Sequence, residues 1–394
     1  MKTCFHYSFF IFLSYLFCQC DSPNNTENTN FSASTIETKV SKKEDTSPFL
    51  VPIHNIASAK YENLQIFILK NQTDADNMTY VPLQKAMDKK WVEIIETSNV
   101  NELAITNHSN KTIFIHAGDI VKGGKQDRTL AYDLVVAPNV NQEKITSFCV
   151  ESDRWHQRGD EAVTGFASNK NMLTSRSLKI ASKEANNQTY VWASVSEQQE
   201  KLNTTIRAHY SLNIDVKDKT SATSLDLTLE NKQLQELKQS YKTHFKTLDL
   251  QEATGYACAI NGEVYYVDIY NNQQLFSNLW SKLLDALIVE AIADLDTTST
   301  LTTTHLSTET LMQILNKNID ATSQIKTLNS RTEWHSKEDS TKIIFTSLDK
   351  GNSAKWVHQN LIFRNAHAMA TPISQPQHFY NNQIQSLDMR LNTN

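Results

Sequence analysis

The spacing between apolar residues changes near Gly165, and this change limits the fold more than any other feature. Before Gly165, apolar residues come in short runs separated by turn formers, which is typical of antiparallel strands. These runs are Leu64–Leu69, Trp91–Ile95, Leu103–Ile105, Ile113–Ile115, Leu130–Val136 and Ile145–Val150. After Gly165 the apolar spacing lengthens to three and four residues, as in helices. We therefore predict an α+β fold, in which an antiparallel, β-rich, sandwich-like N-terminal half packs with helices and a β-hairpin from the C-terminal half.

A β-hairpin that leads into a long helix is the clearest local prediction. Asn261-Gly262 is a dipeptide that two-residue type I′ turns prefer, and apolar runs flank it on both sides. Paired apolar residues then recur along Leu275–Ile288 and form a broad apolar stripe on a helix. Asn271 or Asn272 is expected to cap this helix. Asp268 could point at a site or help to cap the helix, and capping is the favoured interpretation.

The N-terminus has the features of an export signal. Lys2 precedes an apolar run from Phe9 to Phe17, and a polar segment follows Cys20 directly. This pattern resembles a bacterial lipoprotein signal, in which such a Cys becomes the lipidated first residue. We predict lipidation at Cys20 in a membrane-anchored lipoprotein of the bacterial cell envelope; secretion after ordinary cleavage is the alternative. No later run approaches about 18 apolar residues, so we expect membrane contact through the lipid anchor only.

Composition divides the chain into segments. We expect a signal peptide at 1–20, a flexible polar linker at 21–50, an α+β domain at 51–294, a polar insertion at 295–340, returning strands of the same domain at 341–370, and a tail at 371–394. Cys149 and Cys258 lie within the domain, and two buried free thiols are favoured over a disulfide between them.

The net charge argues against a nucleic-acid partner, and the positions of the glycines indicate where a functional site is to be sought. The formal net charge is -5, which gives no electrostatic attraction for nucleic acid. Of only 8 glycines, five lie between Gly118 and Gly165. Because glycine is so rare here, these positions indicate backbone conformations that need it.

The first candidate site is the loop from Gly118 to Arg128. Successive backbone N–H groups in a glycine-rich turn can bind an anion, and nearby cations strengthen such a site. The residues predicted to contact a ligand are Gly123, Gly124, Lys125, Gln126 and Arg128. The alternative is a purely structural glycine turn between two strands.

The second candidate site follows the strand that ends at Cys149. Glu151 is the residue predicted to act as acid or base, Arg154 is suited to a phosphate or carboxylate, and Trp155 offers a stacking surface. The alternative is a structural ion pair of Glu151 with Arg154 or Arg128, with Trp155 in the core. We find no metal-binding or cofactor motif, and predict no cofactor and no metal. A nucleophilic pair of Cys149 with a histidine is disfavoured.

Three motifs in this order carry a family resemblance. They are Ala117-Gly-Asp-Ile-Val-Lys-Gly-Gly-Lys-Gln-Asp-Arg128, Val150-Glu-Ser-Asp-Arg-Trp155, and Asn261-Gly-Glu-Val followed by Asp268 and the helix at Leu275. Together they resemble the ARG and Rhodanese-Phosphatase-superfamily-associated Protein domain family over residues 52–294, with 295–340 as a departure. The resemblance implies, by association, a role in ADP-ribose or NAD metabolism.

Residues and resemblance together predict an envelope protein with a ligand-binding or hydrolytic site for an ADP-ribose-like or other phosphorylated small molecule. Whether the protein is an enzyme stays open at this point. The alternative function is that of a non-catalytic envelope lipoprotein whose β-rich domain binds a protein or glycan partner.

Overall fold

Strands from both ends of the described chain build the largest sheet, which is antiparallel throughout. The computed structural model describes residues 38–41, 52–71, 78–161, 164–296, 305–317 and 322–364. In spatial order the sheet contains β1 (Thr38–Ser41), β15 (Thr322–Thr327), β16 (Thr332–Glu338), β17 (Lys342–Asp349), β18 (Lys355–Phe363), β14 (Glu263–Tyr270), β13 (Gly255–Ile260), β3 (Leu64–Asn71) and β2 (Ile53–Tyr61). The returning strands predicted near the C-terminus therefore lie inside this sheet, because β18 pairs with both β17 and β14.

Residues 80–167 form two smaller sheets. One has the order β10 (Leu134–Val136), β7 (Thr112–Ile115), β4 (Tyr80–Pro82), and the other has the order β12 (Phe166–Ala167), β8 (Ile120–Gly123), β9 (Arg128–Leu130), β11 (Glu143–Cys149), β6 (Glu102–Asn107), β5 (Val92–Glu96). Their apolar side chains share a core of their own, which includes Ile94, Ile113 and Val136. This region contains most of the short apolar runs of the predicted β-rich half, whereas the first run, Leu64–Leu69, lies in β3 of the large sheet.

Helices dominate the chain between β12 and β13 and follow the β13–β14 hairpin. The helices are α1 (Leu83–Asp88), α2 (Arg176–Lys183), α3 (Gln188–Tyr210), α4 (Leu225–Glu230), α5 (Lys232–Phe245), α6 (Gln273–Ala293) and α7 (Thr308–Leu315). The predicted α+β class is confirmed. Among the described residues no helix is both long and apolar enough to cross a membrane.

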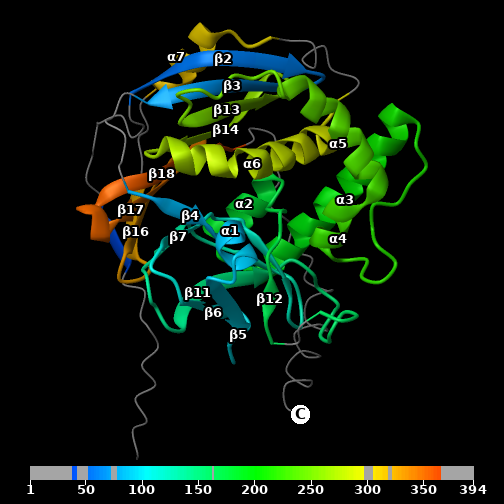
Figure 1. Ribbon diagram of the computed structural model, residues 1–394. Coiled ribbons are helices and arrows are strands. Elements are labelled where there is room, and N and C mark those ends of the chain that lie inside the picture. Colours follow the sequence, from blue (N-terminus) through cyan, green and yellow to red (C-terminus); the bar gives the residue numbers. More distant parts are fainter. Residues whose placement is uncertain are drawn as a thin grey trace, which may run out of the picture. The chain divides into compact units, whose positions relative to one another are not determined.

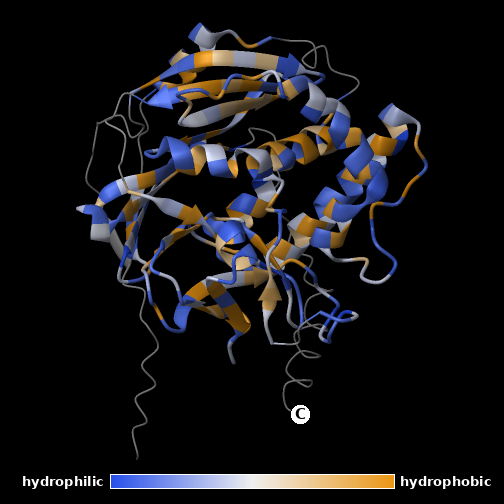
Figure 2. Ribbon diagram, viewed as in Figure 1, coloured by the Kyte–Doolittle hydropathy of each residue, from blue (hydrophilic) through white to orange (hydrophobic). Residues whose placement is uncertain are grey.

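The large sheet is covered on both faces. Successive side chains of a strand point to opposite sides, so each face contributes to a different apolar cluster. In β13, Tyr256 and Cys258 pack in the cluster that contains α6, whereas Ala257 and Ala259 pack in the cluster that contains α7. Figure 1 shows α6 beneath β13 and β14 and α7 on the other side of the sheet. Figure 2 shows apolar residues along α6, where both the sheet and the neighbouring helices cover it.

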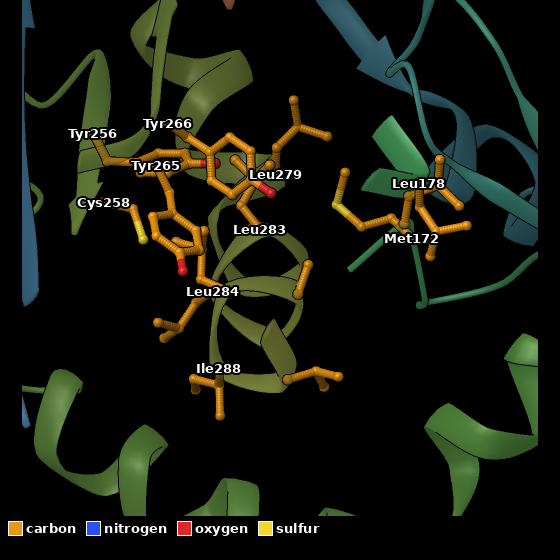
Figure 3. Close-up of a cluster of buried hydrophobic side chains, with 14 of the residues drawn as sticks. Met172, Leu178, Tyr256, Cys258, Tyr265, Tyr266, Leu279, Leu283, Leu284 and Ile288 are labelled. Atoms are coloured by element: carbon orange, nitrogen blue, oxygen red, sulfur yellow. The ribbon is translucent and has the colours of Figure 1, made fainter. Parts of the chain in front are cut away.

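The hairpin before α6 has the predicted turn and an additional bulge. Asn261 and Gly262 have φ values of 52° and 81°, the positive values that a type I′ turn requires. Cys258 lies opposite Tyr266 and Ala259 lies opposite Val264, so Tyr265 has no partner on β13 and forms a β-bulge. The bulge lets Tyr265 and Tyr266 both join the core around α6, as Figure 3 shows. The predicted cap of α6 is confirmed at Asn272, whose side chain accepts from the N–H of Leu275.

The structure also tests the predictions about the cysteines and the polar insertion. Cys149 and Cys258 are free and buried, as favoured from the sequence. Within the segment predicted as a polar insertion, α7, β15 and β16 belong to the fold. Cys20 and the signal segment lie outside the described residues, so lipidation stays a prediction.

Candidate functional site

The glycine loop folds as a turn whose backbone N–H groups bond to the chain's own carboxylates. Gly123 N–H donates to Asp127 Oδ1 (3.0 Å), Lys125 N–H to Glu96 Oε1 (3.2 Å), and Asp127 N–H to Glu151 Oε2 (3.3 Å). Gly124 needs its positive φ of 57°, and a Cβ there would lie 2.7 Å from Phe166. An external anion at this loop would compete with three internal carboxylates.

Arg128 is buried and holds together the base of this loop. Its Nη2 lies 3.3 Å from Glu96 Oε2, and its Nη1 donates to the Cys149 sulfur at 2.8 Å. Of the two ion pairs considered for Glu151, the structure forms the one with Arg154, and Arg128 pairs with Glu96 instead. Burial raises the pKa of the Cys149 thiol to about 12, which leaves this thiol protonated and unsuited to act as a nucleophile.

The strand-end motif forms the other half of the same ion-pair network. Arg154 is 4% exposed and bonds to Glu151 (2.9 Å) and Asp127 (3.4 Å). Arg158, which the sequence reading did not single out, also bonds to Asp127 (3.0 Å) and Glu151 (3.5 Å). Burial raises the pKa of Asp127 to about 6, although Arg158 opposes that shift.

These contacts place the sequence-predicted residues in one buried structural network. Lys125 is exposed and Trp155 is half-buried, while Gln126, Arg128, Glu151 and Arg154 are buried. The arrangement agrees with the structural alternative for the glycine loop and with the predicted Glu151–Arg154 ion pair, but Trp155 is half-buried rather than in the core. The ligand-binding roles of these residues and the catalytic role of Glu151 stay predictions.

A second polar cluster lies on the α6-facing side of the large sheet, and His358 is at its centre. His358 is fully buried, and its Nδ1 and Nε2 lie 2.9 Å from Asp133 Oδ2 and Asp268 Oδ1, respectively. Burial alone would lower the pKa of His358, but the charges and hydrogen bonds of Asp133 and Asp268 raise it above its usual value. Burial also disfavours ionisation of Asp268, yet the hydrogen bond and charge of His358 hold the pKa of this carboxyl below its usual range.

Strand register explains why these residues meet. Asp268 of β14 lies directly opposite Tyr256 of β13 on one side and Asn360 of β18 on the other. Both neighbours donate to its carboxylate, Tyr256 Oη to Oδ2 at 2.5 Å and Asn360 Nδ2 to Oδ1 at 2.8 Å. His358 lies two residues before Asn360 on the same face of β18, opposite Tyr270. The sheet therefore fixes three of the polar groups rigidly.

The smaller sheets bring His116 and Asp133 to the same place. His116 directly follows β7, and Asp133 directly precedes β10, the strand paired with β7. Asp133 Oδ1 accepts from the N–H of Ala117 (2.8 Å), which ties the two loops together. Burial, and then the charge of His358, lower the pKa of His116 to about 4, so this imidazole is neutral at neutral pH.

A small pocket opens beside this cluster. It is lined by His116, Ala117, Gly118, Met172, Leu173, Lys179, Ser182, Lys183, Tyr256, Asp268, Leu283, Ala286 and Asn360. Its cavity volume of about 10 Å³ is roughly what one water molecule needs. Figure 3 shows Leu283 on α6 and Met172 to its right, two of the apolar residues that line this pocket. We call it the inner pocket.

Helix α2 supplies two lysines to the inner pocket. Lys179 and Lys183 are four residues apart on one face of the helix. Lys183 is buried and donates to Asn360 Oδ1 (3.1 Å), and the ammonium of Lys179 lies 3.6 Å from the centre of the Tyr266 ring. The inner pocket thus combines cationic donors, a neutral imidazole and a carboxylate.

The sequence reading missed this cluster, and its interpretation of Asp268 as a capping residue was wrong. Asp268 precedes the cap residue Asn272 closely in sequence, but its carboxylate bonds to Tyr256, His358 and Asn360 instead. One usable signal was the pair of polar residues His358 and Asn360 between the apolar residues Val357 and Leu361. Buried polar residues spaced by two positions indicate a polar spot on one sheet face.

Comparison with known proteins identifies the family of this chain but no individual relative. No curated protein and no solved structure matches the chain. One family model matches residues 53–362, a range that includes both polar clusters and the 295–340 segment that sequence analysis set apart. Because that range covers most of the chain, the protein belongs to the ARG and Rhodanese-Phosphatase-superfamily-associated Protein domain family.

Proposed function

We propose that the protein binds the phosphoryl end of a phosphorylated small molecule in the inner pocket, with ADP-ribose-like compounds as the ligand class. The observation that carries this proposal is that two lysines, Lys179 and Lys183, line a pocket that His116 and Asn360 also line. Ammonium groups are common phosphate-binding groups in proteins. The description of the family as associated with the rhodanese-phosphatase superfamily is compatible with such a ligand.

The inner pocket suits an anion better than the glycine loop does. At the loop, the positive and N–H groups bond to the carboxylates of Glu96, Asp127 and Glu151. In the inner pocket, the Lys183 ammonium donates to the neutral amide of Asn360, and the Asp268 carboxylate that also lines the pocket is bonded to Tyr256, His358 and Asn360. An ammonium has three N–H donors, so Lys183 can also donate to a ligand oxygen without losing an ion pair.

The size of the pocket limits what can enter it. A volume of about 10 Å³ admits a single oxygen-sized group rather than a nucleotide. Lys179 is half-buried, whereas the other lining residues are buried, so the pocket meets solvent at Lys179. A phosphoryl oxygen would enter there, and the rest of the ligand would lie outside.

Calorimetric titration of the full-length, metal-free protein with inorganic phosphate and with ADP-ribose tests this proposal. Lys183→Met keeps the buried side chain but removes its charge, and we expect it to weaken binding by about tenfold or more. Lys232→Met, at an exposed position of α5, is the matched control and should bind as the wild type does. The proposal would be contradicted if neither compound bound, or if Lys183→Met bound with wild-type affinity. Either result would favour the partner-binding alternative.

We also propose that the protein acts outside the cytoplasm, attached through a lipid on Cys20. The support is the lipoprotein-like signal at residues 1–20. In a bacterial host, Cys20→Ala should move the protein out of the membrane fraction. Unchanged membrane association would contradict lipid attachment at this residue.

A further inference from the structure

Two histidines and one carboxylate beside the inner pocket are arranged as metal ligands usually are. One ligand atom from each of His116, Asp268 and His358 lies within 4.8 Å of the other two. Nitrogen and oxygen ligands lie about 2.1 Å from a zinc-like ion, so two ligands of one ion are at most about 4.2 Å apart. Closing the three atoms to that spacing needs only small shifts of the side chains.

Hydrogen bonds at Nδ1 leave Nε2 of both histidines as the nitrogen that can bind an ion, which at His116 would take the place of the Tyr270 hydroxyl, now 2.8 Å from Nε2. His116 Nδ1 lies 2.9 Å from the carbonyl oxygen of Ala117, and a carbonyl only accepts, so Nδ1 carries the proton. His358 Nδ1 lies 2.9 Å from Asp133 Oδ2, which likewise accepts. Metal-binding histidines almost always donate their second ring N–H to a carbonyl or carboxylate in this way.

Asp133, the carboxylate that bonds to His358 Nδ1, is itself held in place. Asp133 accepts from the Ala117 N–H through Oδ1 and from the Ser347 hydroxyl through Oδ2 (3.0 Å). It is therefore fixed independently of His358. A carboxylate that orients a histidine in this manner also raises the basicity of the coordinating nitrogen.

We propose that His116 Nε2, His358 Nε2 and Asp268 bind one divalent transition-metal ion of the zinc, iron or manganese class. Two histidines and one carboxylate are a common ligand set for such ions and leave coordination positions open. Asp268 and His116 also line the inner pocket, whose volume suits about one water molecule. The open position of the ion therefore faces the pocket. Binding replaces the proton that bridges His358 Nε2 and Asp268 Oδ1, and this proton is released to solvent.

The test is a titration of the full-length, chelator-treated protein with Co²⁺, followed by its visible absorption and by competition with Zn²⁺, without phosphate. We expect one ion per chain. His116→Asn and Asp268→Asn should weaken Zn²⁺ binding by about 100-fold or more, and the positioning variant Asp133→Asn by about 10- to 100-fold. His108→Asn is the matched control, because His108 is an exposed histidine, and it should bind metal as the wild type does.

Two results would overturn the proposal. One is the absence of stoichiometric binding by the wild-type protein, which would leave His358 as a protonated bridge between two carboxylates. The other is unchanged Zn²⁺ affinity in His116→Asn. Circular dichroism of each variant identifies those that fold, and His116→Asn is the most informative because His116, unlike Asp268, makes no ion pair with His358. Metal binding measured without phosphate is independent of the phosphoryl-ligand proposal.

Discussion

Arg154 shows at the scale of one residue how the glycine-loop region is stabilised. Its guanidinium bonds to two carboxylates that are fully buried, Glu151 and Asp127. Removing one partner of a buried ion pair leaves the other charge without compensation. We therefore predict that Arg154→Ala lowers the free energy of unfolding by about 3 kcal/mol, measured by denaturant titration.

Lys125→Ala, at an exposed position of the same loop, is the control for that measurement. It should change stability by about 0.5 kcal/mol or less. If Arg154→Ala instead keeps wild-type stability and loses affinity for phosphate or ADP-ribose, the loop is a ligand site and the structural interpretation is wrong.

Glu290 makes a residue-scale prediction about pH. Its carboxyl accepts from the Tyr266 hydroxyl (2.6 Å) and from the N–H of Arg176 (2.8 Å), and burial raises its pKa from 4.5 to about 7. The folded state thus holds the proton more tightly than the unfolded state does. The resulting stabilisation is complete below about pH 4.5 and is lost as the pH rises through about 7.

Glu290→Gln cannot ionise and should lack this loss of stability. Relative to the wild type, its free energy of unfolding should rise by about 3 kcal/mol between pH 4 and pH 8, because each pKa unit corresponds to about 1.4 kcal/mol. Thermal unfolding across this pH range measures the difference. Glu263→Gln, at an exposed position of β14, should follow the wild-type profile; a parallel profile for Glu290→Gln would contradict the prediction.

At the scale of elements, the sequence predicts what short-range contacts determine. The Asn261-Gly262 turn and the Asn272 cap of α6 follow from local backbone requirements, and both are confirmed. The bulge at Tyr265 was not predictable, because the β13–β14 pairing alone determines which residue is skipped. The order of the large sheet was not predictable either, since β18 pairs with strands on both sides and β1 pairs with β15.

The inner pocket was missed for the same physical reason. Asp268 and His358 are 90 residues apart in sequence, and His116 is 154 residues from its partner Tyr270. No local spacing indicates that such residues meet. The glycine loop and the Glu151–Trp155 segment were visible because each is a short run of unusual residues in the sequence, and for the most part their contacts support the fold.

At the scale of the whole molecule, one core joins the large sheet to the smaller ones. All described residues belong to one compact unit, residues 36–394. The largest apolar cluster combines Phe114 and Val135 of the smaller sheets with Tyr266 and Val357 of the large sheet and with α6. His116 and Asp133 lie at this junction, so the geometry of the inner pocket depends on both parts of the fold.

The last strands are therefore expected to be essential for folding rather than an addition to a complete domain. A chain that ends at Asp296 lacks β15–β18, so β14 loses the strand beside it, and Val357 and Ile362 leave the main core. Exposure of these apolar faces removes stabilisation of about 25 cal/mol per Å², and an unpaired β14 edge promotes aggregation. We predict that this truncated chain has no cooperative thermal transition, whereas the full-length chain unfolds cooperatively. The measurement is differential scanning calorimetry of both chains, with limited proteolysis as a second readout. A cooperative transition in the truncated chain would show that residues 36–296 fold independently, and the inner pocket would then be an interface between two separate folding units.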